Sequence, residues 1–159
     1  MQVVQNGGIT SLETGDVVIF SGIGAPLEDG GSPVIQVEAA NFANSTAVAG
    51  VVFSQYNIDK LRAGTEDART EVTSQGAAAP GEYLLVVVQG PAQVKASAIS
   101  GALQPGDLLS SAGPAGVAAK ANEVSLNGVE TAIPGTILGK ALEPITDGQA
   151  LIYIFVTLQ

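Results

Sequence analysis

Short apolar runs separated by glycine and proline are the dominant pattern of this chain. They are clearest in residues 101–159, where the runs are Leu108-Leu109, Val117-Ala118-Ala119, Thr136-Ile137-Leu138 and residues 151–158. The turns between them fall at Gln104-Pro105-Gly106-Asp107, Gly113-Pro114, Ile133-Pro134-Gly135 and Asp147-Gly148. Runs of this kind are typical of short strands joined by tight turns, and no window shows a sustained helical period. The pattern therefore predicts an all-β module.

The same order of features occurs twice along the chain. In each copy a Gly-Asp turn leads into a strand, a glycine-centred strand follows, and a glycine turn leads into a long apolar strand. The first copy has Gly15-Asp16-Val17-Val18, Val48-Ala49-Gly50-Val51-Val52 and Pro80-Gly81-Glu82. The second has Gly106-Asp107-Leu108-Leu109, Ile137-Leu138-Gly139-Lys140-Ala141 and Asp147-Gly148-Gln149. One Gly-Asp turn arises by chance in many β proteins, but three features in matching order indicate an imperfect two-fold internal repeat. The predicted fold is a β-barrel or β-sandwich-like module built on that repeat.

The repeat suggests how the chain divides. We expect an N-terminal arm (1–14), a first β lobe (15–100) and a second β lobe (101–159), together forming one compact domain. The first lobe contains an insertion at 55–76 that has no match in the second copy, and such insertions lie on the surface. Residues 122–131 predict a hairpin, because Asn127-Gly128 is a strong two-residue turn signal.

The most apolar strands predict the core. We expect the following residues to be largely buried, in the chain or against a partner: Val86, Val88, Leu108, Ile137, Leu151, Ile152, Ile154 and Val156. Three valines in succession at 86–88 suggest burial on both faces of a strand.

Composition favours self-association. The 159 residues are 46% hydrophobic and 13% charged, and the mean hydropathy is +0.35. A chain with so few charges is expected to place much of its surface against something else, most simply other copies of itself. A compact monomer with a large β core is the alternative.

The net charge of −9, with six basic residues in all, excludes several partners. Nucleic acids and anionic membrane surfaces are bound by clustered lysine and arginine, which this sequence lacks. No apolar run approaches the length that spans a membrane, so membrane insertion is not expected. The first residues also lack the basic and apolar pattern of a signal peptide.

Catalysis is not expected. Without cysteine or histidine, thiolate or imidazole metal sites and Cys/His nucleophile systems are excluded. Ser110-Ser111 and Lys120 could formally pair, but a turn serine and a solvent-facing lysine explain them more simply. Asp16 and Asp107 occupy positions where an aspartate caps a turn. We therefore assign no catalytic, cofactor-binding or metal-binding residue.

Two regions are candidate interaction sites. Strands with little charge at their edges can add to a neighbouring subunit's sheet, and the candidate assembly contacts are Val3, Val4, Ile9, Ile152, Ile154 and Val156. On this basis residues 1–10 are expected to contact another copy. The insertion is a candidate recognition loop through Tyr56, Lys60, Arg62 and Arg69; a solvated loop without a special role is the alternative.

The second half resembles a known family. The motifs that carry the resemblance are residues 90–96 (GPAQVKA), 104–111 (QPGDLLSS), 116–121 (GVAAKA), 134–144 (PGTILGKALEP) and 156–159 (VTLQ). They are similar to the C-terminal β domain of phage tail fibres, tail spikes and large bacterial surface proteins. The β-rich module is more loosely similar to trimeric head-decoration proteins of tailed phages. No catalytic motif defines this family, so the resemblance implies a structural role.

Two functions remain open at this point. The first is a non-enzymatic, self-assembling subunit of a virion, phage-like particle or extracellular filament, forming a homo-oligomer such as a trimer or a helical array. The second is an adhesin or receptor-binding tip that recognises a glycan or a protein. Because the β module starts almost at the beginning of this sequence, with no stalk before it, we favour the free-standing assembly subunit. The expected location is the virion or the cell exterior.

Overall fold

The computed structural model describes residues 1–56 and 76–159, and this part of the chain consists of strands, turns and loops without a helix. The first strands are β1 (Gln2–Asn6), β2 (Val17–Gly24), β3 (Val34–Ala39), β4 (Val48–Tyr56) and β5 (Tyr83–Val87). They are followed by β6 (Gln89–Ser97), β7 (Leu108–Ser111), β8 (Ala118–Lys120), β9 (Glu123–Leu126), β10 (Val129–Ala132), β11 (Gly139–Ala141) and β12 (Gln149–Thr157). The all-β prediction is confirmed. No helix in the described ranges is long and apolar enough to cross a membrane.

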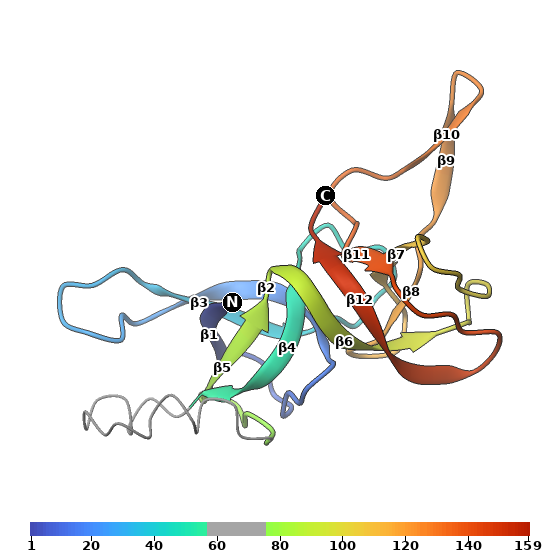
Figure 1. Ribbon diagram of the computed structural model, residues 1–159. Coiled ribbons are helices and arrows are strands. Elements are labelled where there is room, and N and C mark those ends of the chain that lie inside the picture. Colours follow the sequence, from blue (N-terminus) through green and yellow to red (C-terminus); the bar gives the residue numbers. More distant parts are fainter. Residues whose placement is uncertain (57–75) are drawn as a thin grey trace.

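The strands form two closed barrels that lie side by side (Figure 1). The neighbours around the first barrel are β1, β3, β2, β4 and β5; around the second they are β6, β8, β7, β11 and β12. In each barrel one ladder is parallel, β1 with β3 and β6 with β8, and the other ladders are antiparallel. The two barrels therefore have the same topology, which confirms the internal repeat. The β9–β10 hairpin is an addition between β8 and β11.

The predicted Gly-Asp turns are equivalent in detail. In the first barrel the Asp16 carboxylate accepts the Glu13 amide at 2.9 Å, and in the second the Asp107 carboxylate accepts the Gln104 amide at 2.9 Å. The preceding glycines have nearly the same left-handed φ, 94° at Gly15 and 95° at Gly106. Glycine adopts this conformation without the steric cost that a side chain would add.

The same turns are also tied to the glycine-centred strands in the same way. The Gly15 amide donates to the Val52 carbonyl and the Val52 amide to the Asp16 carbonyl; Gly106, Ala141 and Asp107 repeat this pair of bonds. Sequence features separated by about half the chain thus mark one local structure that is built twice.

The boundary between the repeats differs from the predicted one. Residues 1–14, which we expected to form an arm, contain β1, and β1 pairs with β5 and β3 inside the first barrel. Residues 89–97, which we assigned to the first lobe, form β6, and β6 pairs with β12 and β8 inside the second barrel. The reason is that β1 and β6 are the equivalent opening strands of the two barrels, so each barrel begins one strand earlier than its Gly-Asp turn.

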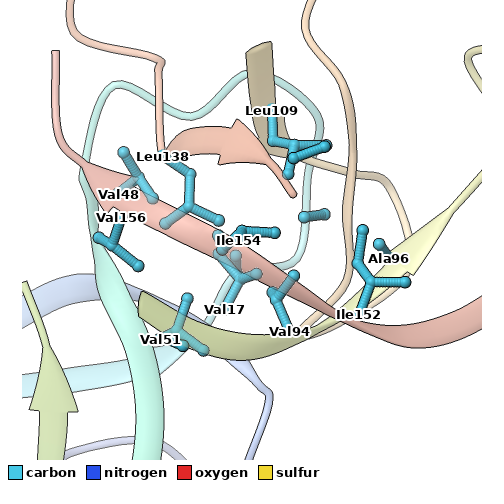
Figure 2. Packing of buried hydrophobic residues seen from close by; sticks show 14 of the residues in the cluster. Val17, Val48, Val51, Val94, Ala96, Leu109, Leu138, Ile152, Ile154 and Val156 are labelled. Atoms are coloured by element: carbon cyan, nitrogen blue, oxygen red, sulfur yellow. The ribbon is translucent and has the colours of Figure 1, made fainter. Parts of the chain in front are cut away.

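A shared core joins the two barrels. One buried cluster contains Val17, Val48 and Val51 from the first barrel together with residues of β6, β7, β11 and β12 from the second (Figure 2). A separate cluster around Leu12, Val37, Leu84 and Val86 belongs to the first barrel alone. Backbone bonds also cross the junction, from the Val17 amide to the Gly116 carbonyl and from the Lys95 amide to the Gly15 carbonyl, both at 2.9 Å.

The core prediction is confirmed within the chain for most residues, whereas Val88 and Leu151 are exposed on the single chain and their burial against a partner stays a prediction. Burial is confirmed for Val86, Ile137, Ile152, Ile154 and Val156, and Leu108 is half-buried. Val88 is 38% exposed because it lies where the chain passes from one barrel into the other. Leu151 is 49% exposed because the side chains of β12 alternate, and Ile152, Ile154 and Val156 occupy the inward positions.

Candidate assembly surface

The side chains that we predicted as assembly contacts mostly serve the fold of the single chain. Val4, Ile152, Ile154 and Val156 pack in the core. Their strands do not present the free edges that motivated the prediction, because β1 lies between β3 and β5 and β12 lies between β11 and β6. Closing a barrel removes sheet edges, and sequence patterns do not reveal this closure.

The remaining predicted residues are placed as follows. Val3 is half-buried in β1, whereas Ile9 is 96% exposed in the connection to β2. Tyr56 is the last residue of β4 and is half-buried. Lys60, Arg62 and Arg69 of the predicted recognition loop lie outside the described residues.

The outward side of β12 forms an apolar surface on the second barrel. Leu151, Tyr153 and Phe155 are each between 42% and 49% exposed, and Leu142, just after β11, is 49% exposed. Lys140 of β11 lies opposite Phe155. We call these five residues the outer face of the second barrel. Single exposed apolar residues are normal, but a group of leucine and aromatic side chains on one surface is a candidate interaction site.

The β9–β10 hairpin also exposes apolar side chains. We call its residues 123–132 the hairpin arm. It projects away from both barrels (Figure 1), and its two strands pair only with each other. The turn residues Asn127 and Gly128 have φ of 52° and 81°, as expected for the predicted two-residue turn.

The two faces of the hairpin arm differ sharply. Directly opposite residues in an antiparallel pair lie on the same face, and the register pairs Val129 with Leu126 and Thr131 with Val124. One face is therefore apolar, with Leu126 60% exposed and Val129 65% exposed. The other face carries Glu123, Ser125, Glu130 and Ala132.

Sequence reasoning missed this surface although a signal was present. Residues 123–126 alternate between polar and apolar types, and in residues 151–156 the alternate positions Leu151, Tyr153 and Phe155 share one side of the strand. The second pattern is hidden because both sides of β12 are apolar, so the run looks like a strand buried on both faces.

A charged cluster at the junction of the barrels has a structural role. Lys95 of β6 donates to the carboxylates of Glu13 and Asp16, with 2.6 Å to Asp16 Oδ1. The hydrogen bond from Lys95, followed by its charge, lowers the pKa of Glu13 below its ordinary value. Partial burial acts to lower the pKa of Lys95, but the hydrogen bonds and charges of Asp16 and Glu13 outweigh it, so the pKa is raised. Both shifts favour the charged pair that connects the barrels.

The serines considered for catalysis lie at the same junction. The Ser110 hydroxyl donates to Asn44 Oδ1 at 2.8 Å, and the Ser111 hydroxyl donates to the Phe42 carbonyl at 2.9 Å. Both serines are 1% exposed, and Lys120 pairs instead with Asp107 at 3.7 Å. These hydroxyls connect the two barrels. The described ranges contain no group of three or more carboxylates, histidines or cysteines placed to hold a metal ion.

Comparison with known proteins gives one similar structure. No family model matches the chain, and no curated protein matches it. The chain is similar to the crystal structure of the head fiber gp8.5 N base in bacteriophage phi29, with 14% sequence identity and a TM-score of 0.47. The match covers 98% of this chain and 91% of that chain. A likeness at this level carries no argument about function, and the resemblance to tail-fibre domains remains a prediction.

Proposed function

We propose that this protein is a structural, self-associating subunit of a virion or phage-like particle. The observation that carries the proposal is the pair of exposed apolar surfaces, the hairpin arm and the outer face of the second barrel, on a chain with few charges. Apolar surfaces of this kind are unfavourable in water and become favourable when a partner covers them.

The hairpin arm is the stronger of the two indications. A two-stranded hairpin alone is at best marginally stable in water, and stability usually requires a third strand or a packed apolar face. The arm has neither within the described part of the chain. Contact with another copy would supply the packed apolar face that the arm lacks. A monomer offers no such contact.

The rest of the proposal concerns context. The virion location is what the resembled family implies. The homo-oligomeric state (a trimer or a helical array) is proposed from the low charge and the exposed apolar surfaces, and the non-enzymatic role from the absence of cysteine and histidine. The adhesin alternative depended on residues 55–76, of which 57–75 are not described. No feature of the described residues favours it over a structural subunit.

Sedimentation velocity and electron microscopy of the purified chain test the proposal. We expect trimers or larger species whose fraction increases with protein concentration, and regular rings, shells or fibres in micrographs. A chain that remains monomeric at high concentration would contradict the proposal. A monomer that binds members of a glycan array would instead support the adhesin alternative.

A further inference from the structure

We propose that the hairpin arm of one copy docks, through its apolar face, on the outer face of the second barrel of the next copy. This inference rests on the proposed self-association and adds to it by naming the two surfaces that meet. The occupant of each surface is then a second copy of the chain.

The two surfaces are complementary in chemistry. The arm presents Val124, Leu126 and Val129 as small and branched apolar side chains. The outer face presents Leu151, Tyr153 and Phe155 along β12, with Leu142 beside Tyr153. Aromatic side chains of this kind are the usual anchors of an interface centre. A single kind of contact would therefore cover both of these surfaces.

The two surfaces also match in length. Strands β9 and β10 each have 4 residues, which corresponds to roughly 10–14 Å at about 3.4 Å per residue. The outward residues of β12 run from Leu151 to Phe155, four residue steps and thus also about 14 Å. The apolar face of the arm is therefore long enough to reach from Leu151 to Phe155.

Charge favours this pairing over contact between two arms. The arm carries the carboxylates of Glu123 and Glu130 and no basic residue, whereas the outer face carries the ammonium group of Lys140. In the described ranges Glu123, Glu130 and Lys140 make no ion pair within the chain. The Glu143 carboxylate, which accepts the Tyr153 amide at 2.9 Å, balances the charge of Lys140, so docking there avoids the repulsion between two acidic arms. Because the carboxylates lie on the opposite side of the arm from its apolar face, they remain at the wet rim after docking. Such rim charges contribute mainly to the rate and orientation of encounter.

The contact has a consequence for the assembly. An arm that docks on a different surface of the next copy makes a head-to-tail contact, which closes into a ring or continues as a filament. Both a trimer and a helical array can be built in this way, and each copy uses one arm and one outer face.

Chemical cross-linking tests the contact directly, because the chain has no cysteine. A Leu126→Cys variant and a Tyr153→Cys variant are mixed and treated with a short bismaleimide. We expect a cross-linked dimer from the mixture, which can form only between copies. Ile99→Cys mixed with Leu126→Cys is the matched control, since Ile99 is 68% exposed but lies between β6 and β7. Cross-linking of Leu126→Cys with itself in preference to Tyr153→Cys would overturn the proposal in favour of contact between arms.

Association measurements give a second test. Leu126→Ser is expected to weaken self-association at least tenfold while the circular dichroism and the melting of the barrels stay unchanged, because the arm lies outside both barrels. Ile99→Ser makes the same kind of change and should keep wild-type association. Lys140→Glu should lower the rate of association, and combining it with Glu130→Lys should restore part of that rate.

The outcomes separate the two proposals. If the unmodified chain is monomeric at every concentration, self-association itself fails. If the chain assembles, but the 126–153 cross-link is absent and Leu126→Ser assembles normally, the arm contact alone is overturned.

Discussion

The two barrels have the same topology but use the same turn differently. In the first barrel Asp16 is 7% exposed and binds Lys95 of the second barrel. In the second barrel the equivalent Asp107 faces outward, and Lys120 of the same barrel lies 3.7 Å from it. One local structure therefore forms part of the junction in one repeat and part of the surface in the other.

The repeats differ most where segments leave the barrel. In the first barrel the β2–β3 hairpin extends away from the body (Figure 1). In the second barrel the hairpin arm lies between β8 and β11. Barrel strands are constrained by pairing and burial, whereas connections tolerate change and carry function. The barrel strands therefore form the common scaffold, and the hairpins that project from the barrels distinguish the two repeats.

The largest effect is expected at Gly50, in one of the two glycine-centred strands. A side chain at Gly139 would meet the Phe155 carbonyl, and one at Gly50 would meet the Val87 carbonyl. Overpacking of this kind costs about 1–3 kcal/mol, which is the loss expected for Gly139→Ala. Gly50 also has a φ of 143°, which adds about 1–3 kcal/mol for a residue with a side chain. Urea unfolding followed by circular dichroism measures both losses.

Gly113→Ala is the matched control for these variants. A side chain at Gly113 would meet no atom within 4 Å, so a change within about 0.5 kcal/mol is expected. Equal losses at Gly50, Gly139 and Gly113 would show that the losses at Gly50 and Gly139 do not come from contact between the added side chain and the neighbouring strand.

Leucine truncations test whether the barrels unfold together. Leu84 belongs to the cluster of the first barrel, and Leu109 belongs to the cluster that spans both; each is 0% exposed. Leu84→Ala and Leu109→Ala should each cost about 2–5 kcal/mol. Hydrogen exchange should then increase mainly in the first barrel for Leu84→Ala and in both barrels for Leu109→Ala. Exchange confined to the second barrel in Leu109→Ala would mean that the shared core does not couple them.

The two turn aspartates provide a smaller and more specific contrast. Asp16→Asn removes a charged hydrogen-bond partner of Lys95 at a nearly buried position, and a loss of about 1.5–3 kcal/mol is expected. Asp107→Asn affects a more exposed pair with Lys120 and should cost about 0.2–1 kcal/mol. Thermal unfolding of the two variants under the same conditions compares them. A larger loss for Asp107→Asn would reverse the roles assigned to the two turns.

The turns and the repeat could be predicted from sequence because their signals are local. Glycine, proline and aspartate at fixed offsets identify Gly15-Asp16 and Gly106-Asp107, and Asn127-Gly128 identifies the hairpin arm. The opening strands could not be predicted in this way. In β1 residue type does not follow the faces, because Asn6 is buried whereas Val3 lies on the outward side with Gln5. The strand is defined by partners such as Leu85 that lie far along the chain. The outer face of the second barrel was missed for a related reason, because which side of β12 faces the core depends on barrel closure.

The smallest expected effect concerns pH. At the position equivalent to Glu13 the second barrel has Gln104, so Glu13→Gln makes the first turn resemble the second. Lys95 lowers the pKa of Glu13 from an ordinary value of 4.5, so the stabilisation is full above pH 4.5 and is lost as the pH falls through the lower folded value. The pKa of Lys95 is raised from 10.5, so its contribution is present below pH 10.5 and is lost as the pH rises through the higher folded value.

The free energy of unfolding of the wild type and Glu13→Gln should therefore differ by a constant amount between about pH 5 and pH 10 and converge at both extremes. Urea titrations across this range measure the difference. Asp29→Asn is the control, because Asp29 is exposed in the β2–β3 loop and has no hydrogen bond or ion pair in the described ranges. A difference that persisted at pH values below the lowered folded pKa of Glu13 would show that Glu13 stabilises the junction through packing, because its charge is lost there. The first turn would then differ from the second in shape as well as in charge.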